Sequence, residues 1–216
     1  MRDEDLSSFL ISMNSEIQAA IIEHQAAFGL ELSDEQIVRL DRYYAIVQEH
    51  NALLHLVAPC PAEEFAVRHL LESLTLLKHL PASAKIADIG AGAGLPSLPC
   101  LLVREDLKGR LIDSKEKKVR FLVEAAEQLG LAQRVEVVGK QFIETHAADA
   151  THVTCRALEK FSEWLPRLVR WSRGRKMLFF GGPTLAEVLN KEKIRYASEL
   201  MPLSERRFLY AIGPGS

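Results

Sequence analysis

Residues 84–99 read A-K-I-A-D-I-G-A-G-A-G-L-P-S-L-P and decide the fold of this chain. The apolar run that ends at Ile89 predicts a buried strand, and the glycines after it let the backbone take positive φ and let a ligand approach closely. A second strand, expected over 110–112, leads directly into Asp113. A carboxylate placed about 20 residues after such a turn can accept hydrogen bonds from ribose hydroxyls. The glycine turn and Asp113 together predict a nucleoside-binding site.

The glycine turn also indicates which nucleoside is bound. Its third glycine comes one residue earlier than in the G-x-G-x-x-G pattern of dinucleotide sites, and Pro96 and Pro99 remove two amide donors from the next helix. Because phosphates bind free amides at a helix N-terminus, such a turn favours a ligand without phosphate. We therefore predict S-adenosylmethionine as the cofactor. A nicotinamide or flavin nucleotide, or a turn without a ligand, is the alternative.

The first eighty residues are expected to be helical. Apolar residues recur every three or four positions over 6–28, 34–51 and 63–80, and Ser33 with Gln36 forms a capping-box signal. These three helices predict an N-terminal helical extension, residues 1–81.

Beyond residue 81 the pattern alternates between strand and helix, which predicts an α/β domain over 82–216. Its sheet should be doubly wound and mostly parallel, closed by the antiparallel hairpin usual in methyltransferases. The expected fold is the Rossmann-like fold of class I S-adenosylmethionine-dependent methyltransferases. Strands are expected near 85–89, 109–113, 134–138, 152–155, 175–180, 194–200 and 206–212, and helices near 97–104, 115–130, 158–172 and 183–189.

Composition places the chain among globular proteins. Its 216 residues are 48% hydrophobic and 26% charged, enough to bury a full core. The three cysteines show neither disulfide nor metal-ligand spacing. The start M-R-D-E-D has the wrong charge for a secretory signal, and no uncharged apolar run reaches about 18 residues. We expect a cytoplasmic monomer that uses no metal and contacts no membrane.

Charge is distributed unevenly along the chain. Residues 1–36 carry a net charge of −7, which leaves +5 for residues 37–216 of the total of −2. Basic residues gather within 115–120 and again within 167–176. Such groups can meet nucleic-acid phosphates, although solvated helix faces are the alternative interpretation.

The carboxyl ends of the predicted strands should line one crevice. Phe142 and Ile143 would flank the adenine, and Arg156 would project where methyl donor and acceptor meet. A core position for Phe142 and a surface ion pair for Arg156 are the alternatives. The predicted cofactor contacts are Asp88, Gly90, Gly92, Gly94, Leu95, Asp113, Ser114, Phe142, Ile143 and Arg156.

Four motifs lie within residues 40–182: R-H-L-L-E-S-L at 68–74, D-I-G-A-G-A-G-L-P at 88–96, L-I-D-S-K-E-K-K-V-R-F-L at 111–122 and C-R-A at 155–157. Together they resemble the bacterial small-subunit rRNA guanine-N7 methyltransferases, also called the glucose-inhibited division protein B family. The resemblance implies methylation of 16S rRNA, with the small-subunit rRNA or ribosomal particle as partner. It puts cofactor roles on Gly90, Leu95, Phe142, Ile143 and Arg156, and the ribose role on Asp113.

The implied chemistry requires neither a catalytic triad nor a metal. Guanine N7 offers an in-plane lone pair and carries no proton, so attack on a sulfonium methyl needs positioning but no general base. Methylation of pyrimidine C5 is the alternative, with Cys155 as the nucleophile.

The motif at 68–74 supplies further candidates. On a helix, Arg68 and Glu72 can pair, and His69 shares the adjoining face with Ser73. The resemblance places this face over the cofactor turn. We take Arg68, His69 and Arg156 as candidate catalytic residues that close the site and hold the base, with a purely structural role as the alternative.

Three segments depart from the family pattern. His55-Leu56-Val57 replaces Asn-Leu-Thr, Gln141-Phe142-Ile143 replaces an Arg/Ala/Glu-type segment, and Phe180 replaces a lysine before Gly181. We expect Phe180 to offer a stacking surface in place of a phosphate contact. A diverged methyltransferase for another nucleic acid or a small molecule, or a cofactor-binding protein without turnover, is therefore the alternative function.

Overall fold

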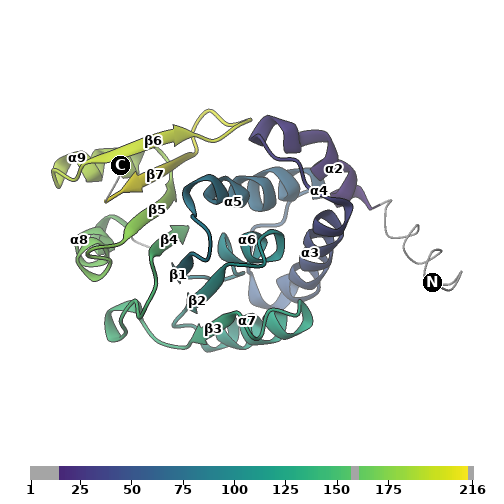
Figure 1. Ribbon diagram of the computed structural model, residues 1–216, viewed down its shortest axis with the longest axis horizontal. Helices are drawn as coiled ribbons and strands as arrows, with labels where there is room; N and C mark the ends of the chain where they lie inside the picture. The colour runs from purple at the N-terminus through teal and green to yellow at the C-terminus, as the bar shows by residue number, and fades with distance from the viewer. Residues whose placement is uncertain (1–14, 157–160, 214–216) are drawn as a thin grey trace, which may run out of the picture.

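The computed structural model describes residues 15–156 and 161–213, in which a seven-stranded sheet lies between two layers of helices (Figure 1). The strand order is β3-β2-β1-β4-β5-β7-β6. Strands β1 to β5 pair in parallel, and β7 runs antiparallel to both of its neighbours. This sheet confirms the predicted doubly wound fold with its closing hairpin. The strands are β1 Lys85–Ile89, β2 Lys108–Ile112, β3 Val135–Val138, β4 His152–Arg156, β5 Lys176–Gly181, β6 Tyr196–Leu200 and β7 Phe208–Ile212.

Alternate residues of the central strands point into two separate cores. On β1, Ile86 packs into the core beneath α6 and α7, whereas Ala87 and Ile89 pack into the core beneath α8 and α9. Both faces of the parallel strands are therefore covered, as buried parallel sheets require. Figure 1 shows α8 and α9 on one side of the sheet and the other helices on the opposite side. The four helices are α6 Ser97–Val103, α7 Glu116–Gln128, α8 Phe161–Trp171 and α9 Pro183–Lys191.

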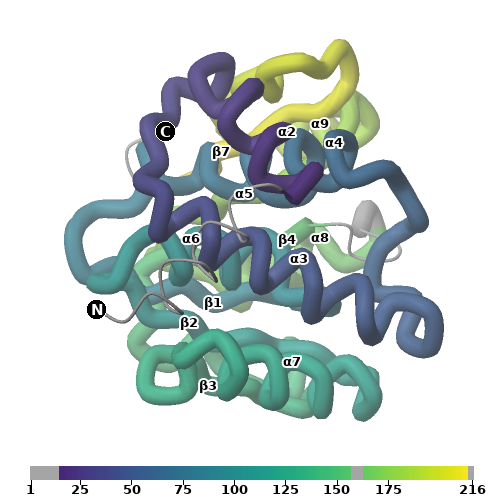
Figure 2. The backbone as a smooth tube through the Cα atoms, turned by 90° about the vertical axis from the view of Figure 1, so that its right-hand side faces the viewer, coloured from purple at the N-terminus to yellow at the C-terminus, as the bar shows by residue number. Residues whose placement is uncertain are grey.

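Of the N-terminal helices, α3 forms a further layer over α6 and α7, and α2 packs against α3. Helix α2 spans Glu16–His24 and continues as the 3-10 turn η1, Gln25–Phe28, and α3 spans Asp34–Leu54. The predicted capping box at the start of α3 is confirmed, because Ser33 and Gln36 bond each other's backbone amides. Helix α3 crosses α6 and α7 (Figure 2).

The third predicted helix is not regular. It consists of α4 (Ala62–Phe65), the π-helix η2 (Ala66–Leu71), α5 (Glu72–Leu74) and the 3-10 helix η3 (Thr75–His79). The structure therefore confirms helix over the predicted span, with a π-helical interior that the sequence did not predict. The Glu72 amide donates to the Val67 carbonyl, five residues back, so the chain takes one extra residue per turn there.

Two predicted elements extend beyond the described residues. Residues 6–14 of the first predicted helix and 158–160 of the helix before β5 lie outside them. Strand β6 begins later than predicted, because α9 continues to Lys191 and Lys193 then takes a positive φ of 55°. Within the described residues, no helix is long and apolar enough to cross a membrane.

Candidate active site

The glycine turn after β1 is held open by its backbone. Gly90, Gly92 and Gly94 all take positive φ, at 69°, 56° and 87°. A Cβ atom on Gly94 would come within 2.3 Å of the Leu98 side chain, so only glycine lets α6 pack this closely. The turn is also tied to β2, because the Gly90 amide donates to the Ile112 carbonyl at 2.8 Å.

Asp113 joins this turn to the next loop. One carboxylate oxygen accepts from the Gly92 amide at 3.0 Å, and the other accepts from the Lys115 amide at 2.9 Å. The residue is 7% exposed. Each carboxylate oxygen keeps lone pairs for a ligand, so Asp113 can support the turn and bind hydroxyls at the same time.

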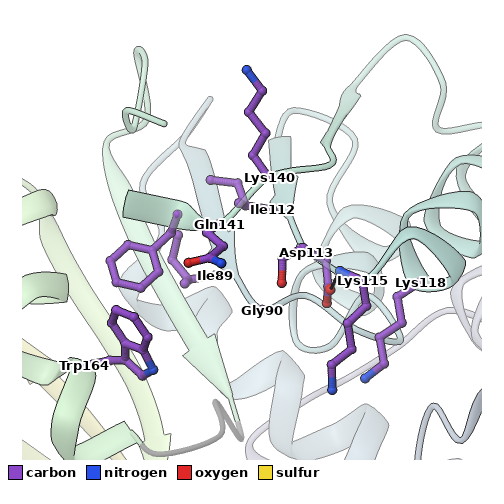
Figure 3. A pocket seen from close by; sticks show the side chains of 11 residues that line it. Ile89, Gly90, Ile112, Asp113, Lys115, Lys118, Lys140, Gln141 and Trp164 are labelled. Atoms are coloured by element: carbon purple, nitrogen blue, oxygen red, sulfur yellow. Dashed lines mark hydrogen bonds between the residues drawn. The ribbon is translucent and has the colours of Figure 1, made fainter. Parts of the chain in front are cut away.

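A cavity of about 270 Å³ opens beside Asp113. In Figure 3, Trp164 lies on one side of it, and Asp113, Lys115 and Lys118 lie on the other. Phe142, which also lines the cavity, meets Trp164 edge to face at 5.7 Å between ring centroids. An aromatic wall opposite a carboxylate suits an adenine and its ribose.

Asp88 lies at the end of β1 with no exposed surface. Neither carboxylate oxygen has a partner in good hydrogen-bond geometry among the described residues. Burial raises the pKa of Asp88 to about 7, and the nearby Ser97 offsets only part of this effect. The site therefore contains a buried carboxyl group that has no ion-pair partner among the described residues.

Tyr43 connects the N-terminal helices to the glycine turn. It is fully buried on α3, and its hydroxyl donates to the Ala93 carbonyl at 2.9 Å. Because Ala93 lies between two of the turn's glycines, α3 helps to fix the shape of the turn. Sequence reasoning missed this role, since the helical period marks Tyr43 only as a core residue.

A second group of side chains surrounds Arg156 at the end of β4. Its guanidinium donates to the Arg68 carbonyl and to the Ser73 hydroxyl, the latter at 3.4 Å, and one nitrogen lies 3.3 Å from His69 Nδ1. The guanidinium also stacks over the Phe180 ring at 5.6 Å. Arg156 is thus held on several sides, with only 15% of its side chain exposed.

Glu72 is the buried anion of this group. It is 1% exposed, and its oxygens lie 3.7 Å from an Arg156 nitrogen and 2.5 Å from Arg207 Nε. Burial raises the pKa of Glu72, and the two arginines act in the opposite direction. Burial and then the positive charge of Arg156 lower the pKa of His69 to about 3. His69 is therefore neutral at physiological pH.

Sequence comparison decides the family. The family model described as GidB, rRNA small subunit methyltransferase G, matches residues 36–208. The chain belongs to this family. A protein of Sorangium cellulosum named Ribosomal RNA small subunit methyltransferase G is 39% identical over 160 residues, which cover 70% of this chain and 66% of that protein. The matches cover between 53% and 67% of four such relatives.

Solved structures agree on the fold. The crystal structure of a SAM-dependent methyltransferase from Aquifex aeolicus has a TM-score of 0.53 at 20% identity and covers 65% of this chain and 88% of that one. An RNA methyltransferase from Salinibacter ruber, solved with S-adenosyl-L-homocysteine, has a TM-score of 0.51 at 20% identity. The match covers 72% of this chain and 92% of that one. Together with the sheet, these likenesses confirm the predicted Rossmann-like methyltransferase fold.

All the predicted site residues except Ile143 fall into three places. Gly90, Asp113, Ser114 and Phe142 line the cavity. Four more belong to β1 or its turn and are not among the cavity-lining residues, namely Asp88, Gly92, Gly94 and Leu95. Arg68, His69 and Arg156 come together in the second group. Ile143 is 43% exposed and does not line the cavity, unlike its neighbour Phe142.

Sequence reasoning missed several residues of the candidate site. Trp164 lines the cavity from α8, where helical periodicity gave no sign of a ligand contact. Lys115 and Lys118 also line it, although they were predicted only as part of a basic cluster. Arg207 is 135 residues from its partner Glu72, and no local pattern could have found it.

Two expectations about the second group were wrong. Arg68 pairs with Glu64 and not with Glu72, because Glu72 points inward and meets the two other arginines. Phe180 is not an exposed stacking surface. It is only 8% exposed and lies against Arg156.

Cysteine and metal chemistry find no further support among the described residues. Cys155 is fully buried and packs into the core on the α8 side of the sheet, so its thiol is not accessible to a base. In the described part of the chain, no three histidine, cysteine or acidic residues are grouped to hold a metal ion.

Proposed function

We propose that the protein transfers a methyl group from S-adenosylmethionine to N7 of a guanine in small-subunit rRNA. The family match over residues 36–208 carries this proposal, because it includes both the cavity and the Arg156 group. Relatives at 34% and 39% identity carry the same name.

The residues around the cavity fit the cofactor. Asp113 would accept hydrogen bonds from the ribose hydroxyls, and Phe142 would lie beside the adenine. The buried Asp88 carboxyl has no ion-pair partner among the described residues, and the ammonium of the cofactor's amino-acid tail would supply one. When bound, the cofactor supplies an electrophilic methyl on its sulfonium.

The chain's own residues would orient the base and exclude water. Guanine N7 needs no proton removed, which suits a site where His69 has a pKa of about 3. Arg156 would donate hydrogen bonds to the acceptor nucleotide from its fixed position. Glu72 would balance positive charge as it develops on the base.

We also propose that residues 1–81 form a helical extension of the 82–216 domain, and that the protein is a metal-free cytoplasmic monomer. The Tyr43 bond to the turn supports a role for the extension in the site. Light scattering after gel filtration would measure the molar mass in solution. We expect the mass of one chain, and the mass of a dimer would contradict the proposal.

Labelled S-adenosylmethionine tests the proposed function. The protein would be incubated separately with small subunits that lack the modification, with naked rRNA and with large subunits. We expect label in small-subunit rRNA. Label only in large subunits, or no label in any substrate, would overturn the proposal.

A further inference from the structure

Arg156 is the most constrained cation in the described part of the second group. Its guanidinium meets a backbone carbonyl, a hydroxyl, an imidazole, a carboxylate and an aromatic ring. An arginine side chain free in solution loses considerable conformational entropy when it is fixed, so such a position needs several partners. The partners come from two parts of the chain that lie far apart in sequence, residues 68–73 and Phe180.

The π-helix η2 supplies the first contact. In a regular α-helix the Glu72 amide would donate to the Arg68 carbonyl, four residues back. Here that amide donates to the Val67 carbonyl, and the Arg68 carbonyl accepts from Arg156. The irregular turn thus makes a backbone acceptor available to the guanidinium. Single π-turns of this kind are frequent at functional sites.

Glu72 supplies the only carboxylate that meets Arg156 among the described residues. At 1% exposure it could not remain charged without partners, because an isolated buried carboxylate is strongly unfavourable. The nearest Arg156 nitrogen lies 3.7 Å from a Glu72 carboxylate oxygen, which is beyond direct hydrogen-bonding distance. A closer partner is therefore needed to hold the Glu72 carboxylate in place.

Arg207 is that partner. Its Nε donates to Glu72 Oε1 at 2.5 Å, which is a charge-assisted hydrogen bond. The loop between β6 and β7 holds Arg207 in turn, because its amide donates to the Ser204 hydroxyl at 3.1 Å and its carbonyl accepts from the Met201 amide at 2.8 Å. The closing hairpin of the sheet thereby reaches the Arg156 group.

We propose that Glu72 and Arg207 are positioning residues, which fix Arg156 through the chain Arg207–Glu72–Arg156 for its work on the methyl acceptor. This inference rests on the proposed function for what Arg156 does, and on the contacts alone for how it is held. Arg207 acts through Glu72 and does not itself touch the substrate.

Kinetics on small ribosomal subunits test the chemical consequence. Arg207→Gln should lower kcat about 10- to 100-fold, because a small misplacement in an active site has effects of this size. The subunit KM and the affinity for S-adenosylhomocysteine should stay unchanged, and Arg207→Lys should recover part of kcat. The matched control is Arg206→Gln, since Arg206 is the exposed neighbour. Glu72→Gln should lower kcat in the same way.

Two kinetic results would overturn the proposal. One is an unchanged kcat in Arg207→Gln. The other is a raised KM for the subunit at constant kcat, with a KM that depends less on salt concentration than in the wild type. Arg207 would then bind an RNA phosphate directly.

Nitrogen NMR of the Arg156 side chain tests the positioning without reference to turnover. At a temperature where all three proteins are folded, rotation of its guanidinium should be slow in the wild type and in Arg206→Gln, and fast in Arg207→Gln. Equal rotation in all three proteins would refute the positioning role. If the wild type transferred no methyl group, the proposed function would fail, and this NMR result would still decide how Arg156 is held.

Discussion

Asp113 combines two tasks at the residue scale. Its carboxylate accepts hydrogen bonds from the Gly92 and Lys115 amides, and it also lines the cavity. These two hydrogen bonds orient the carboxylate before a ligand arrives, which would lower the entropic cost of binding a ribose.

Asp113→Ala should therefore weaken binding of S-adenosylhomocysteine by about 1.5–3 kcal/mol, the range for a hydrogen bond to a charged group. Isothermal calorimetry would measure the change. Asp149→Ala is the control, because Asp149 is an exposed carboxylate that pairs with Lys85 at the opposite end of β1. Wild-type affinity in Asp113→Ala would contradict the ribose assignment.

Asp88 should make stability depend on pH. Its pKa is about 7 in the folded protein, against 3.8 as the ordinary value. Between these values the folded state binds more protons than the unfolded state, so the free energy of unfolding should fall as pH rises from about 4 to 7. Asp88→Asn should remove this slope and be more stable than the wild type at pH 8, by about 2–4 kcal/mol.

Urea unfolding across this pH range would measure the effect. The comparison at pH 4 is the internal control, because the wild-type carboxyl is then largely protonated and the two proteins should be similar. A parallel pH dependence in both proteins would show that Asp88 is not the group responsible.

At the element scale, α3 supports the glycine turn through Tyr43. Tyr43→Phe removes the hydroxyl and leaves the Ala93 carbonyl without this donor. We expect a loss of about 0.5–1.5 kcal/mol in the free energy of unfolding and weaker binding of S-adenosylhomocysteine. Denaturant titration and calorimetry give the two values.

Tyr44→Phe is the matched control for this change. Tyr44 is the next residue on α3, and its ring packs edge to face against Phe65 at 4.8 Å. Removing the Tyr44 hydroxyl should leave the affinity for S-adenosylhomocysteine unchanged. An equal loss of affinity in both variants would mean that α3 acts through general packing and not through the Tyr43 bond.

The elements differ in how well sequence predicts them. The β1 turn and Asp113 could be predicted, because local order along the chain determines the backbone of a βαβ unit. The π-turn at Ala66–Leu71 could not be predicted, because one extra residue hardly changes the spacing of apolar residues along the helix. Glu72 was expected to pair along the helix with Arg68, but tertiary contacts with Arg156 and Arg207 outweigh that local pair.

At the scale of the whole molecule, the two halves of the site have different sources. The ends of β1, β2 and the segment after β3 build the cavity. The Arg156 group draws instead on β4, on the helices before β1 and on the loop between β6 and β7. The same helices and hairpin also meet through the ion pair of Lys78 with Glu199. The Arg156 group therefore depends on long-range contacts, which explains why it was the harder half to predict.

Methyl transfer to N7 is the most direct test of the central claim. After reaction with small subunits that lack the modification, the rRNA would be reduced with borohydride and cleaved with aniline, which breaks the strand at N7-methylguanine. We predict cleavage at one guanine, dependent on both protein and S-adenosylmethionine. Methyl transfer without such cleavage, or no transfer by protein that binds S-adenosylhomocysteine, would contradict the account.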